Sequence, residues 1–60
     1  MKRKQFIRKI QEAGWAFFGE GGEHSLFAKK GVKFAVPRHN ELKPGIVRSW
    51  EKLNKELDES

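Results

Sequence analysis

One stretch in the second half of the chain limits the fold more than any other. Val32, Phe34 and Val36 alternate with less apolar residues, which is the pattern of a β-strand that buries one face. Gly31 follows a pair of lysines and suits a tight hairpin turn, whereas Pro37 removes a ladder donor and ends the strand. The chain therefore contains a β-hairpin, and the partner strand must come from the residues just before it.

Two earlier stretches have the composition of strands. Residues 15–18 are aromatic and follow a glycine, and residues 24–29 have an extended pattern. Between them, residues 19–23 contain three glycines and are predicted to form a loop. The pattern does not decide which face of the second stretch is buried, because Leu26 and Phe27 lie on opposite faces. Together the three strands predict an antiparallel meander.

Amphipathic patterns flank the three strands. From residue 2 to residue 13 apolar side chains recur at helical spacing, while the basic ones, including Arg3, are predicted to face away. Gly14 suits the end of this helix, and Pro44 suits the first turn of a second one whose apolar stripe reaches Leu57. Two such helices need one apolar surface to cover. The sequence therefore predicts an α+β fold of order α-β-β-β-α, with both helices on one face of a three-stranded antiparallel sheet.

Length and composition exclude several kinds of stabilisation. The chain has 60 residues and no cysteine, so neither a disulfide nor a thiolate zinc site supports it. A chain this short buries only about 60% of its unfolded surface, and we expect one domain over residues 1–60 with its chemistry on the surface. No apolar run approaches the roughly 20 residues of a membrane span, and no signal-peptide pattern follows Met1. We therefore expect a cytoplasmic protein.

Positive charge is unevenly distributed along the chain. The formal net charge is +5; the first ten residues carry five basic side chains and no acid, whereas the last ten carry four acids and two lysines. This asymmetry suits a polyanion that approaches one side of the molecule. Nucleic acid is favoured over a membrane surface or an acidic protein, and solubility alone is the plain alternative.

His24 is the residue best suited to proton transfer. It follows Gly21 and Gly22, which permit a tight bend, and it begins the predicted strand. A histidine side chain has an ordinary pKa of about 6.5, so it can both accept and donate a proton near neutral pH. On spacing alone, a solvated surface histidine is the favoured interpretation.

Four short motifs, taken in order, resemble the HicA family of small RNA-cleaving toxins from bacterial and archaeal toxin–antitoxin pairs. That family has the fold of the double-stranded RNA-binding domain, and the resemblance covers nearly the whole chain. The motifs are Glu-Ala-Gly-Trp at 12–15, Gly-Gly-Glu-His at 21–24, Val-Pro-Arg-His at 36–39 and Glu-Leu-Lys-Pro-Gly at 41–45.

The resemblance implies a metal-independent endoribonuclease that acts on mRNA, needs no cofactor and is neutralised by a HicB-type antitoxin. The family's catalytic histidine follows the glycine-led loop, which implies that His24 is catalytic and that Gly21 and Gly22 form the active-site loop. His39 ranks well below it as a second proton carrier. The residues expected to bind RNA are Lys29, Lys30, Lys33, Arg38 and Lys43. For the lysines of the sheet, protection of exposed edges is the plain alternative.

Two other classes of function stay open at this point. A non-catalytic RNA-binding module would use the same fold without chemistry. A zinc hydrolase is less favoured, because no pair of its ligands has the helical spacing of a metalloprotease motif and no cysteine assists. Its ligands would be Glu23, His24, His39 and Glu41.

Overall fold

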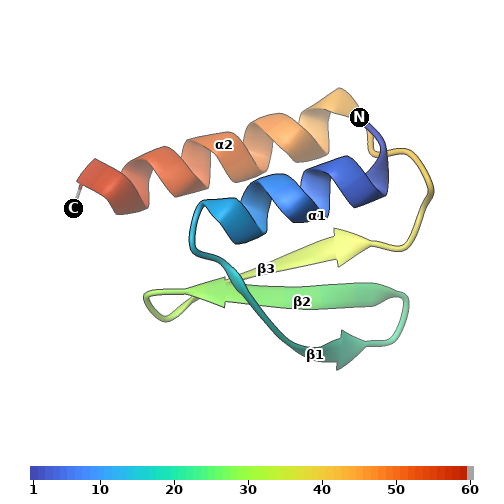
Figure 1. Cartoon of the computed structure of the whole chain (residues 1–60), viewed down its shortest axis with the longest axis horizontal. Coiled ribbons are helices and arrows are strands. Elements are labelled where there is room, and N and C mark those ends of the chain that lie inside the picture. Colours follow the sequence, from blue (N-terminus) through green and yellow to red (C-terminus); the bar gives the residue numbers. More distant parts are fainter. Residues whose placement is uncertain (60) are drawn as a thin grey trace.

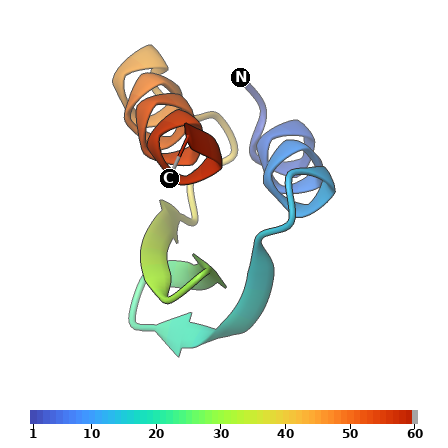
Figure 2. The same ribbon diagram turned by 90° about the vertical axis from the view of Figure 1, so that its left-hand side faces the viewer.

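The helices and strands follow the predicted order in the computed structural model, which describes residues 1–59 (Figure 1). Ser60, part of the predicted domain, lies outside the described residues. The three strands form one antiparallel sheet in chain order, and both helices lie over the same face of it (Figure 2). The predicted α+β class is therefore confirmed. The elements are α1 Arg3–Glu12, β1 Ala16–Gly21, β2 His24–Lys29, β3 Val32–Pro37 and α2 Pro44–Glu59.

Strand register decides which side chains of β2 face the helices. Phe27 pairs with Phe17 of β1 and with Phe34 of β3, and directly paired residues share one face of a sheet. Phe27 is only 2% exposed, so its face is the one that the helices cover. Because successive side chains alternate, His24 and Leu26 lie on the opposite face, which is open. This resolves the ambiguity left by the sequence pattern.

The core joins the covered face of the sheet to both helices through aromatic rings. Trp50 of α2 packs edge-on against Phe6 of α1, with ring centroids 5.7 Å apart, and its ring centroid lies 6.3 Å from that of Trp15. The Trp15 Nε1 also donates a hydrogen bond to Asn54 Oδ1 at 3.0 Å, which ties the α1–β1 connection to α2. The buried apolar side chains are Phe6, Ile10, Trp15, Phe27, Val36, Leu42, Val47 and Trp50.

Strand β1 is longer than the sequence predicted. Residues 19–23 were expected to form a loop, but pairing continues to Gly21, which lies opposite His24. The prediction was wrong because glycine weakens a strand in general, whereas here a side chain would be crowded: a Cβ on Gly21 would lie 3.3 Å from Leu26 Cδ1. The turn is thus reduced to Gly22 and Glu23, and Gly22 has the positive φ of 62° that such a turn uses.

The other end of β2 is anchored to both helical segments. Lys29 Nζ donates hydrogen bonds to the carbonyl oxygen of Ala13 at 2.6 Å and to Asp58 Oδ1 at 3.2 Å. Lys30 and Gly31 then form the predicted hairpin turn, with positive φ values of 51° and 81°. Among the described residues, no helix is long and apolar enough to span a membrane.

Candidate active site

His24 stands at the head of β2, directly after the two-residue turn. It pairs with Gly21 on one side and with Pro37 on the other, so the backbone on both sides of it is fixed by the sheet. Its side chain is exposed and belongs to the open face. The imidazole is therefore accessible from solvent and is not covered by either helix.

Two shallow depressions meet at His24, and both also include His39. These two histidines come from different segments, one from β2 and one from the connection between β3 and α2. The first depression is lined by Gly22, Glu23, His24, Pro37, Arg38 and His39. The second is lined by His24, Pro37, His39, Glu41, Lys43 and Ile46. The fold thus gathers two imidazoles and two permanent cations in one place, a set able to transfer protons and to bind an anion.

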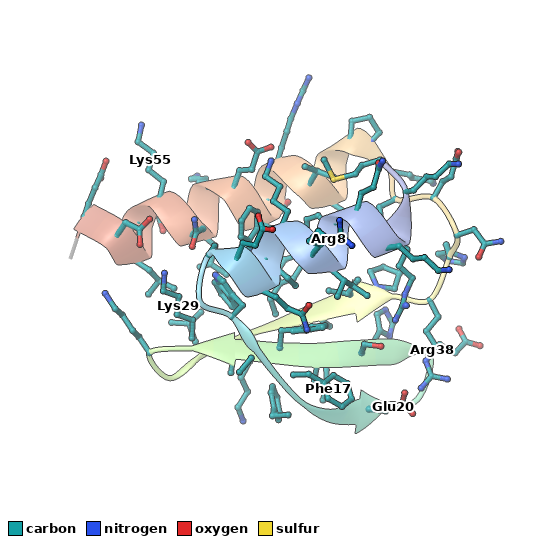
Figure 3. The ribbon with its side chains drawn as sticks, viewed as in Figure 1. Arg8, Phe17, Glu20, Lys29, Arg38 and Lys55 are labelled. Atoms are coloured by element: carbon teal, nitrogen blue, oxygen red, sulfur yellow. The ribbon has the colours of Figure 1, made fainter. Side chains whose placement is uncertain are left out.

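Arg38 is fixed beside the turn that precedes His24. Its guanidinium forms an ion pair with Glu20 of β1, and the two side chains meet next to the β1–β2 turn (Figure 3). Its backbone N–H donates to the carbonyl oxygen of Glu23 at 3.2 Å. The ion pair is largely exposed, so it adds little to stability, but it places a cation close to the imidazole.

Arg3 is a residue of this site that sequence reasoning missed. It was predicted to face away from the core, yet its Nη2 donates to Ser25 Oγ at 2.6 Å and its Nε donates to the carbonyl oxygen of Pro37 at 3.2 Å. Ser25 follows His24 in the chain, and Pro37 pairs with His24 across the sheet. The guanidinium of Arg3 therefore holds both backbone neighbours of the imidazole from the helix side.

Helical periodicity alone could not reveal this role of Arg3. Position 3 lies on the polar side of the α1 pattern, and only the tertiary fold brings the first turn of α1 over the end of β2. One indication was present in the sequence: Ser25 is a polar residue at a strand position whose face is buried, and a buried hydroxyl requires a partner.

The predicted RNA-binding residues fall into two groups. Arg38 and Lys43 line the depressions that contain His24. Lys29, Lys30 and Lys33 lie at the opposite end of β2 and its hairpin, and the Lys29 ammonium is occupied by Ala13 and Asp58. We therefore exclude Lys29 from the proposed RNA surface and assign it to the scaffold.

The ligand set considered for zinc is split by the fold. Glu23 lines one depression and Glu41 lines the other. Within residues 1–59, no group of three or more histidine, cysteine, aspartate or glutamate side chains is arranged to hold a metal ion.

These observations define a class: a small α+β protein with a solvent-facing histidine at a hairpin, flanked by arginine and lysine side chains. A family model described as the HicA toxin of bacterial toxin–antitoxin systems matches residues 3–55. The chain therefore belongs to the HicA toxin family, as the four motifs suggested, and the family implies an antitoxin partner. Searches of curated proteins and of solved structures give no significant match.

Proposed function

We propose that this toxin is a cytoplasmic endoribonuclease that cleaves mRNA by using His24 as a general base. One observation supports this above the others: the exposed imidazole lies where two depressions containing Arg38 and Lys43 meet. RNA brings its own nucleophile, the ribose 2′-hydroxyl. The protein therefore has to position the RNA, accept one proton and stabilise negative charge.

The proposed reaction is a transesterification within the RNA strand. The proton of the 2′-hydroxyl moves to the His24 imidazole as O2′ attacks the neighbouring phosphorus. The bond from phosphorus to O5′ then breaks, and the leaving oxygen takes up a proton. His39, which lines both depressions with His24, is the lower-ranked residue assigned to that second transfer. Arg38 and Lys43 offset the charge that develops on the phosphorane.

The ends of the cleaved RNA test this reaction. We expect one product to carry a 2′,3′-cyclic phosphate and the other a 5′-hydroxyl, because the attacking oxygen belongs to the substrate. Chelation with EDTA should leave the rate unchanged, since no step is assigned to a metal. Mass spectrometry of a short defined RNA identifies the termini. Products with 5′-phosphate ends, or cleavage that stops on chelation, would contradict the proposal.

Arg3→Ala is expected to slow cleavage while leaving RNA affinity nearly unchanged, because Arg3 positions the His24 strand but lies on the helix side of it. It should also reduce the free energy of unfolding by about 1–3 kcal/mol, since it leaves the buried Ser25 hydroxyl without its partner. Steady-state kinetics and urea denaturation measure both effects.

The double variant Arg3→Ala/Ser25→Ala separates the two roles of Arg3. Removing both partners should recover most of the lost stability, because no buried polar group is then left unpaired. If Arg3 positions His24 through Pro37 as well, kcat should stay low in the double variant. Recovery of kcat together with stability would show that Arg3 is merely structural.

We further propose that a HicB-type antitoxin neutralises this toxin by covering His24 and the neighbouring cations. Family membership supports the partner, and the exposure of Arg38 and Lys43 supports an acidic contact surface on it. A purified toxin–antitoxin complex that cleaves RNA at the rate of the free toxin would count against occlusion.

A further inference from the structure

The open face of the sheet carries an aromatic side chain that the proposed reaction does not use. Phe18 is 47% exposed, and it lies in β1 at a register shift between Phe17 and Gly19. Such a bulge inserts one unpaired residue and re-aims its side chain. Phe17 packs against Phe27 on the covered face, with ring centroids 5.6 Å apart, so the bulge separates two consecutive phenylalanines onto opposite faces.

Lys33 confirms the direction of the Phe18 ring. Lys33 pairs with Ala28, whose position in β2 puts both on the open face. Its Nζ lies 5.7 Å from the centroid of the Phe18 ring. A Cβ on the neighbouring Gly19 would meet no atom within 4 Å, so that side of the ring is bordered by open space. Phe18 therefore presents an aromatic surface to solvent with a cation beside it.

The remainder of this face is small, apolar and free of acids. By register, its members in the described strands include two polar side chains, His24 and Lys33, and none is acidic. The open-face residues are Ala16, Phe18, Gly19, Gly21, His24, Leu26, Ala28, Lys33, Ala35 and Pro37. A polyanion can lie across such a surface without repulsion. Small side chains also make it shallow, with no pocket for the anchoring residue that a tight protein interface needs.

We propose that Phe18 is a stacking platform for one nucleobase of single-stranded RNA, and that Lys33 contacts the adjoining phosphate. This inference rests on the proposed function and adds a subsite to it. From strand rise and strand spacing, Phe18 lies on the order of 10 Å from His24. A few extended nucleotides span that distance, so one RNA strand can stack on Phe18 and present a phosphodiester to His24. Exposed aromatics on a sheet face bind bases in this way in other RNA-binding folds.

Binding of a fluorescently labelled, mixed-sequence single-stranded RNA of twelve nucleotides tests the platform. His24→Ala serves as the background, so that the RNA stays intact during the titration. Adding Phe18→Leu should weaken binding about tenfold, the scale of one lost base stack, although the replacement keeps an apolar side chain. Phe18→Trp should bind at least as tightly as Phe18 itself.

Phe17→Leu is the matched control, because Phe17 is similarly exposed but lies on the other face. It should change RNA affinity less than about twofold. Circular dichroism and urea denaturation of all variants establish that each is folded under the binding conditions.

Three outcomes would overturn the platform. RNA affinity that is unchanged in Phe18→Leu, while the parent protein still cleaves RNA, would remove the platform and leave the proposed function standing. Equal losses in Phe17→Leu and Phe18→Leu would show a general structural effect. Unchanged RNA affinity with weakened antitoxin binding would identify the face as a protein interface. If the parent neither binds nor cleaves RNA, the proposed function fails together with the platform.

Discussion

His24→Ala is expected to cleave RNA about 10²- to 10⁴-fold more slowly than the parent protein, and its induction should no longer arrest growth. The range is that of one lost general-base interaction. Because the His24 side chain is exposed and makes no contact with the buried core, the variant should fold normally. Cleavage of a defined RNA under single-turnover conditions measures the loss directly.

His39→Ala is the matched control for this prediction. Its histidine lines the same depressions, is also exposed, and is assigned the secondary proton transfer. We expect a smaller loss of rate for His39→Ala than for His24→Ala, with RNA affinity retained in both. A larger loss for His39→Ala would reverse the assignment of the two histidines. Binding without any cleavage by the parent would instead identify a non-catalytic RNA-binding module.

Trp50→Ala is expected to unfold most of the protein at room temperature. Trp50 is 2% exposed and contacts Phe6 and Trp15, so it joins α2 to the rest of the core. Replacing a buried tryptophan by alanine costs about 3–5 kcal/mol. A chain of this length has a total free energy of unfolding of roughly 3–9 kcal/mol, so this single loss removes a large share of it. Urea denaturation followed by circular dichroism measures the change.

Trp50→Phe separates loss of packing from loss of a hydrogen bond. Among the described residues, the Trp50 Nε1 is buried without a hydrogen-bond partner, so phenylalanine removes no hydrogen bond. We expect a smaller loss of stability than in Trp50→Ala, and a folded protein. Trp15→Phe makes the opposite case, because the Trp15 Nε1 donates to Asn54 and its loss leaves that acceptor unpaired. A midpoint for Trp50→Ala equal to that of the parent would contradict the packing described here.

Most of the architecture was predictable because local rules and tertiary packing agree. The alternation from Val32 to Val36, the glycine after α1 and Pro44 at the start of α2 each specify an element without help from distant residues. Strand β1 was mispredicted because its two glycines argue against a strand locally, while their missing side chains suit the partner strand. The buried face of β2 depended on register, which no short window of sequence contains.

The site was only partly predictable for the same reason. His24 followed from its place after the glycines and from the four motifs, and its exposure agrees with the proposed role. The roles of Arg3 and Lys29 depend on partners more than ten positions away in the chain. Periodicity sorts such residues by helix face or strand face, and it assigns a long basic side chain to solvent by default. Both instead hold the ends of β2 from the helix side.

Chemical rescue tests the role of the imidazole most directly. The exposure of position 24 leaves free imidazole a path to the site once the histidine is removed. We predict that His24→Ala cleaves a defined RNA at least about a hundredfold more slowly than the parent, and that added imidazole restores part of the rate at unchanged RNA affinity. Cleavage by His24→Ala at the parental rate, with or without imidazole, would contradict the assignment of His24 as the base.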